Sequence, residues 1–596
     1  MDTDICGLFI LIAGLAFTIY GMNEVSQHLE KLTGSRIEKI LKKVTKNPFK
    51  SIALGTGITV IMQSSSALAS VLTGLVNSGV MELGQTIGLI MGSNIGTTFT
   101  LWITGLIPFD DNICFYVIGS VALAGIILKM FSSKDKLNDA GTILFSASIL
   151  FAGIYFMTES FNMMKWGPIP SLLPLGKYTL NPGPLLSDPV QTVLKNPFLC
   201  ILAGMIVTVL LQSSSVSIAA LQALSLTGIL PVESAIFLIV GQNIGTSLTS
   251  VISSHGASKN ARRVSFIHLF FNLTGGLLTT AGVWAYVYIH SIDEDITANP
   301  LMIAVIHTAF NVLTSLILIP FSSKLEKLAV LFIKGKDETP DAENNLFIDD
   351  RLLETPSFAL TECRSFAEKM AQLSLDSFRD AFAIAGKFDA KTAEKVLQTE
   401  DLIDDYEDKL GTYLIKLSGC SLTKEDAALV SRLLHCIGDF ERISDHAANL
   451  VKIYREMYER KIRFSHAARI ETEILETAVA DILEMSVNAF INNDADLARK
   501  VEPLEEVING LRMELKNRHV RRLQQDKCTT ELGFIFSDLL TNLERVSDHC
   551  SNIAVCLIQL KDEKFDTHEY ITNLKENDKE FQEMRFQYVE KYSLPD

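Results

Sequence analysis

Two short polar tetrads stand inside apolar, charge-free stretches of the chain. The first, Gln63-Ser64-Ser65-Ser66, lies within residues 51–81, and the second, Gln212-Ser213-Ser214-Ser215, lies within residues 196–232, 149 positions later. Serine hydroxyls can donate hydrogen bonds to anion oxygens and can also coordinate a cation through their lone pairs. The tetrads are therefore candidates for binding an anion and a cation together.

A second pair of motifs repeats at the same offset of 149. Residues 92–97 (GSNIGT) align without a gap on residues 241–246 (GQNIGT). Three polar positions of each copy have the spacing i, i+3, i+4: Asn94, Thr97 and Thr98, and then Asn243, Thr246 and Ser247. In a helix this spacing puts each set on one face, where it could line a cavity. The alternative is that these residues only pack membrane helices together.

Two histidines open copies of H-x-x-F-N, at 268–272 and 307–311. Each is able to change its charge near neutral pH. The competing interpretation, which we favour, is that each hydrogen-bonds to stabilise a helix bundle.

Seven apolar stretches are long enough to cross a bilayer, which takes roughly twenty residues each. They are 5–22, 83–107, 113–131, 140–158, 232–252, 264–289 and 301–319. The first lacks a basic flank and a cleavage site, so we expect a membrane helix and not a signal peptide. The two charge-free stretches that contain the tetrads, 51–81 and 196–232, are too long for one membrane helix and too short for two full crossings. Each is predicted to be a re-entrant hairpin with its tetrad near the tip.

The positions of charged residues support this topology. If each hairpin is counted as no crossing, 13 of the 16 Lys and Arg residues before Pro320 fall on one face of the membrane. Basic residues are enriched on the cytoplasmic side of membrane proteins, so this face is expected to be cytoplasmic. The N-terminus is expected outside, and residues 23–50 are expected to form an amphipathic helix on the inner surface. Each repeat has three crossings, so the second is inverted relative to the first. Such repeats usually hold a substrate site between them near the bilayer midplane.

The charge-free runs contain no Lys or Arg. A charge isolated in mid-membrane costs a few kcal/mol or more, so a bound anion would depend on neutral donors, helix N-termini and an accompanying cation. This favours coupled transport over catalysis. We see no Ser/His/Asp arrangement or nucleotide-binding loop, and no basic stripe for nucleic acid.

The paired QSSS, NIGT and HxxFN motifs resemble the bacterial form of the type II sodium-dependent phosphate cotransporter family, over about residues 5–320. The resemblance implies sodium-driven symport of inorganic phosphate across the plasma (inner) membrane. It implies that residues 63–66 and 212–215 bind phosphate and sodium, with the NIGT positions as weaker candidates. Members of the family import or export, so the direction of flux is open. Three alternatives remain: a phosphate exporter, a carrier of another oxyanion, and a membrane phosphate sensor that does not transport. The protein could also form a homo-oligomer.

The remainder of the chain has a different composition. The whole net charge of -16 belongs to residues after Pro320. We expect a membrane domain at 1–335, with repeats at about 5–131 and 140–289 and a last span at 301–319, then a linker at 336–354. A soluble helical domain should occupy 355–560, followed by a tail at 561–596. Six cysteines without a CxxC pair suit a reducing compartment.

The soluble part carries a repeat of its own. Glu441-Arg-Ile-Ser-Asp-His446 recurs 103 positions later as Glu544-Arg-Val-Ser-Asp-His549. Acids four residues apart share a helix face, so the motif is either a solvated face or a metal site with hard oxygen ligands. It resembles the PhoU family, a tandem pair of three-helix bundles that binds metal and regulates phosphate uptake. The resemblance implies a divalent or iron-type metal at Glu441, Asp445, Glu544 and Asp548. The fold class expected for the whole chain is all-α.

Overall fold

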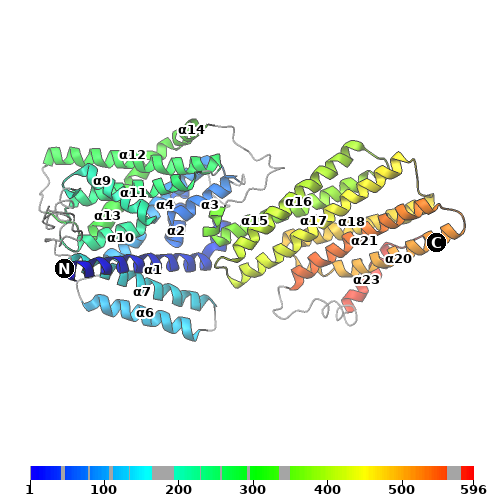
Figure 1. Cartoon of the computed structure of the whole chain (residues 1–596), viewed down its shortest axis with the longest axis horizontal. Coiled ribbons are helices and arrows are strands. Elements are labelled where there is room, and N and C mark those ends of the chain that lie inside the picture. The colour runs from blue at the N-terminus through cyan, green and yellow to red at the C-terminus, as the bar shows by residue number, and fades with distance from the viewer. Residues whose placement is uncertain are drawn as a thin grey trace, which may run out of the picture. The chain divides into compact units, whose positions relative to one another are not determined.

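The computed structural model describes residues 2–41, 47–77, 81–106, 112–132, 135–163, 193–228, 230–255, 258–290, 296–334, 350–559 and 579–595. Within these ranges every regular element is a helix, apart from an isolated antiparallel bridge between Pro231 and Thr297 (Figure 1). The chain divides into two compact units, Met1–Glu343 and Asn344–Asp596. The expectation of an all-α chain is confirmed.

The first unit contains two series of helices in the same order. The first series is α1 (Asp2–Leu41), α2 (Pro48–Met62), α3 (Ser65–Asn77), α4 (Leu83–Gly96), α5 (Phe99–Leu106) and α6 (Asn112–Phe131). The second is α7 (Asp135–Met163), α9 (Pro197–Leu211), α10 (Ser214–Ser225), α11 (Val232–Ser253) and α12 (Lys259–His290). After them come α13 (Pro300–Leu318), a short 3₁₀ turn and α14 (Ser322–Phe332).

The two series run in opposite directions. Helices α1 and α7 open them, and the two helices lie side by side (Figure 1). Gly14 of α1 lies against Gly153 of α7, and Gly21 lies against Ser146 and Leu150, so residue numbers rise along one helix as they fall along the other. An antiparallel pair of equivalent helices is what an inverted repeat requires.

The segment containing each tetrad returns to the level at which it began. Helices α2 and α4 are parallel, because Gly88 lies beside Ser51 and, two turns later, Gly96 lies beside Thr59. Since α2 and α4 start at the same end, α3 must lead the chain back. Helices α9 and α11 are parallel in the same way, with Gly241 against Ile201 and, one turn later, Gly245 against Met205. Both re-entrant hairpins predicted from the sequence are therefore present.

Each hairpin begins at the same four letters, KNPF. Asn47 accepts hydrogen bonds from the N–H groups of Phe49 and Lys50, and Asn196 does the same for Phe198 and Leu199. Asparagine is a strong N-cap, and the proline that follows it suits the first helical position because it has no N–H to leave unpaired. The repeated letters therefore fix where both hairpins start.

Two expectations about the spans are wrong. Residues 23–50 do not begin a separate surface helix, because α1 continues without a break to Leu41; residues 23–41 contain no proline to end the helix. The span expected at 83–107 is divided into α4 and α5 at Thr97 and Thr98. Their hydroxyls bond to the carbonyls of Asn94 and Ile95, but the equivalent Thr246 and Ser247 bond in the same way within the unbroken helix α11, so these bonds alone do not account for the division.

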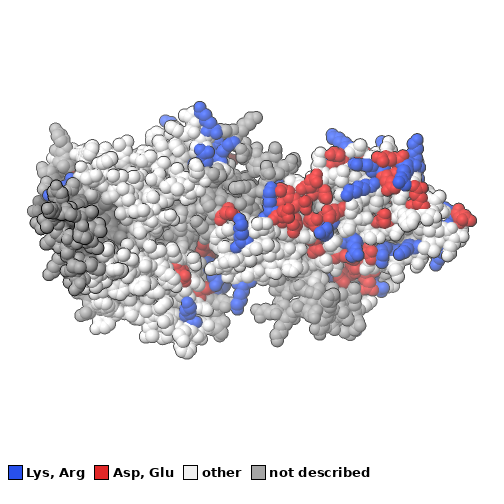
Figure 2. Space-filling model, viewed as in Figure 1, with Lys and Arg blue, Asp and Glu red and all other residues white. Residues whose placement is uncertain are grey.

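Five described helical segments are long and apolar enough to cross a membrane: Cys6–Leu32, Lys136–Phe161, Val232–Ser253, Lys259–Tyr286 and Pro300–Phe332. Large apolar side chains such as Phe9, Tyr116, Leu277 and Leu313 are exposed on this unit. Its visible surface has few charged residues, whereas the second unit has many (Figure 2). The first unit is therefore a membrane domain.

The second unit is a tandem pair of three-helix sets. The first set is α15 (Pro356–Ala383), α16 (Ala390–Ser418) and α17 (Lys424–Glu459), and the second is α18 (His466–Asn492), α20 (Val501–Gln524) and α21 (Thr530–Gln559), with the short α19 (Ala495–Ala498) between α18 and α20. Helix α17 packs on α21 and joins the sets.

The segments expected to flank this unit are only partly described. Residues 336–349 of the expected linker lie outside the described residues, and its last five form a 3₁₀ turn at Asp350–Glu354. Within the expected tail, 561–578 also lie outside. The tail is not wholly irregular, because α23 (Lys579–Lys591) packs on α20 with Phe581 fully buried.

Gly92 offers a test of the close approach between α2 and α4. A Cβ at Gly92 would lie 2.1 Å from the carbonyl oxygen of Ile52, whereas a Cβ at Gly57 of α2 would meet nothing within 4 Å. We expect Gly92→Ala to lower the free energy of unfolding by about 1–3 kcal/mol, as overpacking does, and Gly57→Ala to be neutral or slightly stabilising. Thermal unfolding in detergent measures both; equal effects would contradict the packing described here.

Candidate functional site

Each tetrad forms the turn between the two short helices of a hairpin. Gln63 ends α2 and Gln212 ends α9, with left-handed φ angles of 54° and 52°. Such angles are uncommon for residues other than glycine and are often kept at functional sites. The same unusual conformation occurs at equivalent positions in both halves.

The serine after each glutamine caps the returning helix. Ser64 Oγ accepts a hydrogen bond from the Ala67 N–H at 3.2 Å, and Ser213 Oγ accepts one from the Val216 N–H at 3.4 Å. Ser65 and Ser214 are the first residues of α3 and α10. Each hairpin tip therefore combines serine hydroxyls with the positive end of a helix dipole, which favours an anion.

The first tip is held by two neighbouring helices. Thr100 of α5 donates a hydrogen bond to the Gln63 side-chain carbonyl, and Ser26 of α1 donates one to the Met62 carbonyl. The Thr100 contact was not anticipated from the sequence, although a threonine soon after the NIGT motif was a visible signal.

Each hairpin is also bonded to the helix that follows it, through equivalent positions. In the first half Thr59 donates to Ser93 at 3.0 Å. In the second half Gln242 replaces Ser93, and Ser217 bridges it to Thr208, with distances of 2.9 Å from Thr208 Oγ1 to Ser217 Oγ and 2.9 Å from Gln242 Nε2 to Ser217 Oγ.

The two histidines pair with the asparagines of the NIGT motifs. His268 of α12 lies 3.0 Å from Asn94 Oδ1, and His307 of α13 lies 3.1 Å from Asn243 Oδ1, both measured from Nε2. All four side chains are buried. The interpretation of these histidines as hydrogen-bonding groups is therefore supported. The first bond joins α12 of the second series to α4 of the first, and the second bond joins α13 to α11.

The asparagines that close the HxxFN motifs are fully buried and incompletely bonded. Asn272 has no partner for either side-chain polar atom among the described residues, and Asn311 has none there for its oxygen. Asn311 Nδ2 donates to the His307 carbonyl at 3.0 Å. Buried polar groups are normally satisfied by protein, water or an ion, so these amides are candidate ligands for a small polar species.

The halves are joined by polar contacts that the sequence did not reveal. Thr104 of α5 donates to Gln222 Oε1 of α10 at 2.6 Å, and Gln222 Nε2 donates to the Leu101 and Pro300 carbonyls at 3.0 Å each. Trp102 Nε1 donates to Thr308 at 3.0 Å. For Gln222, the sequence offered one indication of such a contact, which is an amide side chain within the charge-free stretch 196–232.

The remaining predicted positions bond locally. The hydroxyls of Thr246 and Ser247 donate to carbonyls of their own helix, as those of Thr97 and Thr98 do. Of the NIGT positions, Asn94 and Asn243 are the ones that reach another helix. No hydrogen bond within the described ranges joins one tetrad directly to the other, so a site shared by both stays a prediction.

The acidic motifs of the second unit are engaged by arginines. Arg442 lies 3.3 Å from Glu441 and 3.1 Å from Asp445, Arg512 lies 2.9 Å from Glu544, and Arg545 lies 3.5 Å from Asp548. Among the described residues, no group of three or more His, Cys, Asp or Glu side chains is arranged to hold a metal ion. A metal at these four acids therefore has no support from the geometry and stays a prediction of the sequence.

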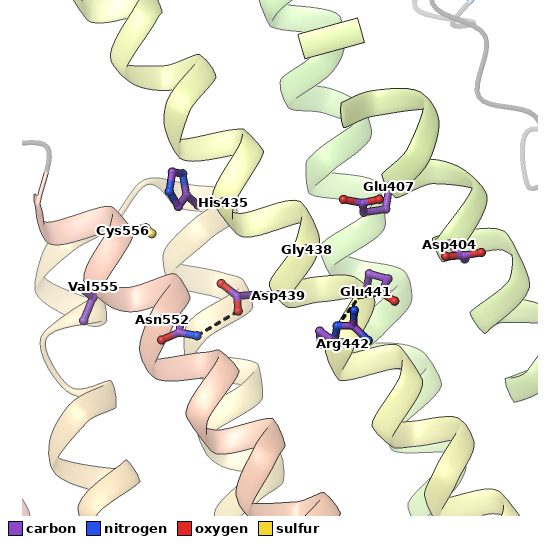
Figure 3. A pocket seen from close by; sticks show the side chains of 10 residues that line it. All are labelled: Asp404, Glu407, His435, Gly438, Asp439, Glu441, Arg442, Asn552, Val555 and Cys556. Carbon is purple, nitrogen blue, oxygen red and sulfur yellow. Dashed lines mark hydrogen bonds and ion pairs between the residues drawn. The ribbon is translucent and has the colours of Figure 1, made fainter. Parts of the chain in front are cut away.

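A cavity of about 700 Å³ opens beside the first of these motifs, between α16, α17 and α21 (Figure 3). Its wall includes Asp404, Glu407, Glu441 and Arg442. Burial, and then the negative charge of Asp445, raise the pKa of Glu441 to about 7. Burial also raises the pKa of Asp548.

Sequence comparisons separate the chain into the same two parts. The model of the Na⁺/Pi-cotransporter family matches residues 17–159 and 182–290, and the PhoU domain model matches residues 367–454 and 473–557. Both matches fall on repeated elements, two hairpin-containing series in the first unit and two three-helix sets in the second.

Three relatives cover different portions of the chain. YqeW of Bacillus subtilis (strain 168) is 29% identical over 330 residues, 55% of this chain and 99% of its own length. YjbB of Escherichia coli (strain K12), which is named as a proposed inorganic phosphate export protein, is 18% identical over 569 residues, 94% of this chain and 99% of its own. Sodium-dependent phosphate transport protein 2A of Mus musculus is 30% identical over 114 residues, 19% of this chain and 18% of its own.

The motifs, the hairpins and the two family matches agree. The chain belongs to the Na⁺/Pi-cotransporter family of phosphate transporters in its membrane unit, and it continues into a PhoU domain.

Proposed function

We propose that the protein is a secondary active transporter that couples the movement of inorganic phosphate to sodium across the plasma membrane. The observation that carries this proposal is the repeated hairpin tip, where a helix N-terminus and serine hydroxyls meet in a run without charged residues. The N-terminus is outside and the PhoU domain is cytoplasmic, as the distribution of basic residues favours.

The chemistry of the tips favours phosphate with sodium. Backbone N–H groups and hydroxyls donate to phosphate oxygens, but they bring no full positive charge to balance the anion. A sodium ion bound nearby supplies that charge, so neither solute is well held alone. This mutual dependence is what couples two fluxes.

Sodium needs oxygen ligands, and the buried amides offer them. The Asn272 and Asn311 side-chain oxygens lack partners among the described residues and follow histidines bonded to the NIGT motifs. Neutral oxygens suit a hard cation. We assign Asn272 and Asn311 to sodium and the tetrads to phosphate and sodium.

The direction of flux has two candidates. The sodium gradient favours import, whereas the name of the Escherichia coli relative, which matches 94% of the chain, favours export. A phosphate sensor that binds without transport is the alternative of another class, and a flux measurement separates it from both.

The PhoU domain is proposed to regulate the membrane unit. The Bacillus subtilis relative aligns over 99% of its own length with only 55% of this chain, so a protein of this kind exists at little more than half the length. A domain that a relative of the membrane unit lacks is suited to control that unit.

Reconstituted vesicles test transport and regulation together. We expect saturable movement of radioactive phosphate that requires a sodium gradient and is reduced by arsenate, because the tips recognise tetrahedral oxyanions through their oxygens. A chain truncated after Lys336 should transport at least as fast. Phosphate binding without flux would favour the sensor, and a folded but inactive truncated chain would contradict a purely regulatory role.

The third residue of each tetrad should matter for phosphate. Ser65→Ala or Ser214→Ala removes one hydroxyl from a tip, and losing a hydrogen bond to a charged group should raise the KM for phosphate about tenfold. Ser120→Ala is the matched control, since Ser120 is exposed on α6 and its hydroxyl, among the described residues, bonds only to the Val117 carbonyl of its own helix. Unchanged kinetics in both tetrad variants would remove these serines from the site.

Asn272 allows function to be separated from stability. Asn272→Leu replaces a buried amide without partners by an apolar side chain of similar size, so stability in sodium-free buffer should be unchanged or higher by about 1–3 kcal/mol. The sodium concentration for half-maximal flux should rise severalfold. A less stable variant with unchanged sodium dependence would show that Asn272 is structural.

A further inference from the structure

The last helix of the membrane unit lies across the starting turns of two other helices. After α13, the 3₁₀ turn at Ile319–Phe321 leads into α14, which packs on α4 and α12 (Figure 1). A Cβ at Gly84, the second residue of α4, would lie 2.7 Å from Glu326 Oε2. At the other end of α14, the Phe332 ring stacks on the Phe266 ring of α12, with centroids 5.1 Å apart. Helix α14 therefore passes from the start of α4 to the start of α12.

One face of α14 is fixed to the unit. Leu325 and Ala329, one turn apart, are buried. Just beyond the helix, Nη2 of Arg263, a residue of α12 that is 1% exposed, donates a hydrogen bond to the Ile333 carbonyl at 3.3 Å. Because this face and the end of the helix are held, the opposite face of α14 must point away from the unit.

The outward face combines lysines with apolar side chains. Lys324, Lys327 and Leu331 are exposed and have the spacing i, i+3, i+7, which puts them on one side of a helix. Leu331 is 61% exposed and Phe332 is 66% exposed, and Val330 between the lysines and Phe332 is also exposed. We call these three the apolar edge of α14.

Positive charge exceeds negative charge around this face. The exposed basic residues, which we call the basic cluster, are Lys324, Lys327, Lys334 and Arg262. None of them forms an ion pair with another described residue, and the one acid in α14 is Glu326. Figure 2 shows Lys and Arg side chains gathered in the part of the first unit where Figure 1 places α14.

This combination favours lipid as the partner. Helix α14 follows α13 and packs on α12, and both of these helices expose apolar side chains such as Leu313 and Leu277. The outward face of α14 therefore meets the boundary of the bilayer. There an apolar edge can enter the acyl region while lysine stems extend to the headgroups. Basic residues beside a membrane surface attract anionic headgroups, so the charge of the cluster selects among lipids.

We propose that α14 is an interfacial helix whose basic cluster binds anionic phospholipid headgroups of the inner leaflet, with the apolar edge among the acyl chains. The assignment to the inner leaflet rests on the orientation proposed above, in which the starts of α4 and α12 face the cytoplasm. Because α14 is the last helix before the expected linker at 336–354, bound lipid would hold the point from which that linker leaves the membrane unit.

Quenching of a fluorophore at position 331 tests the proposal. Leu331→Cys is made in a full-length chain whose nine native cysteines are replaced by serine, labelled with bimane and reconstituted into phosphatidylcholine vesicles. The vesicles contain the same small mole fraction of doxyl-labelled phosphatidylglycerol or doxyl-labelled phosphatidylcholine. We expect both lipids to quench, and phosphatidylglycerol to quench about threefold more strongly because the basic cluster enriches it. High salt should reduce this preference by screening the charges.

Two pairs of substitutions separate the place of the charge from its amount. Lys324→Gln with Lys327→Gln should remove most of the preference. Lys129→Gln with Lys136→Gln is the matched control, because these exposed lysines flank the connection between α6 and α7 and lose the same charge away from α14. Equal quenching by the two lipids would overturn the proposal, and quenching by neither would also overturn it, since protein would then cover position 331.

A second measurement keeps the native cysteines. In native mass spectrometry of the full-length chain, phosphatidylglycerol should bind more tightly than phosphatidylcholine, and only the substitutions at Lys324 and Lys327 should weaken it. Equal binding of both lipids would contradict the proposal even if the cysteine-free chain does not fold. Neither measurement uses phosphate flux, so failure of the proposed transport function would leave both results unchanged.

Discussion

Two helices of the membrane unit, α2 and α9, end in the middle of apolar sequence. Most other features of the unit compensate for the unpaired backbone groups at these helix ends. A helix end leaves backbone groups without partners, and such groups are costly where water is scarce. The tetrads reduce that cost with a left-handed glutamine and a capping serine at each tip. The tetrads leave other N–H groups at the start of α3 and α10 unpaired, and these groups are available to an anion.

The inverted repeat depends on close packing of backbones. Glycines at 55, 92, 204 and 241 let each hairpin's first helix lie against the helix that follows it, at distances a side chain would not allow. Small residues are the usual means of packing membrane helices, since lipid offers no hydrophobic drive for their association. Polar contacts such as Thr104 with Gln222 then join the halves. Two closely packed halves that are joined by polar contacts suit a protein whose halves move relative to each other.

Much of the fold could be predicted from the sequence because motifs that are weak evidence alone occur twice, at the same spacing. The tetrads, the KNPF starts and the NIGT copies recur at one offset, and the hairpins followed from counting apolar lengths. The break at Thr97 and Thr98 was missed because apolar length alone does not show where a helix ends inside an apolar stretch. The pairing of His268 with Asn94 was missed because it joins residues far apart in the chain. The acids at Glu441 and Asp445 could not be judged without their arginine partner.

The central claim is that the two hairpins enter the membrane from opposite faces, and the exposed lysines at their bases test it most directly. Cysteine is introduced at Lys50 or Lys195 in a chain whose nine native cysteines are replaced by serine, and an impermeant thiol reagent is applied to right-side-out and inverted vesicles. The account predicts that position 50 reacts only from the cytoplasmic face and position 195 only from the outer face. Reaction of both positions from the same face would contradict it.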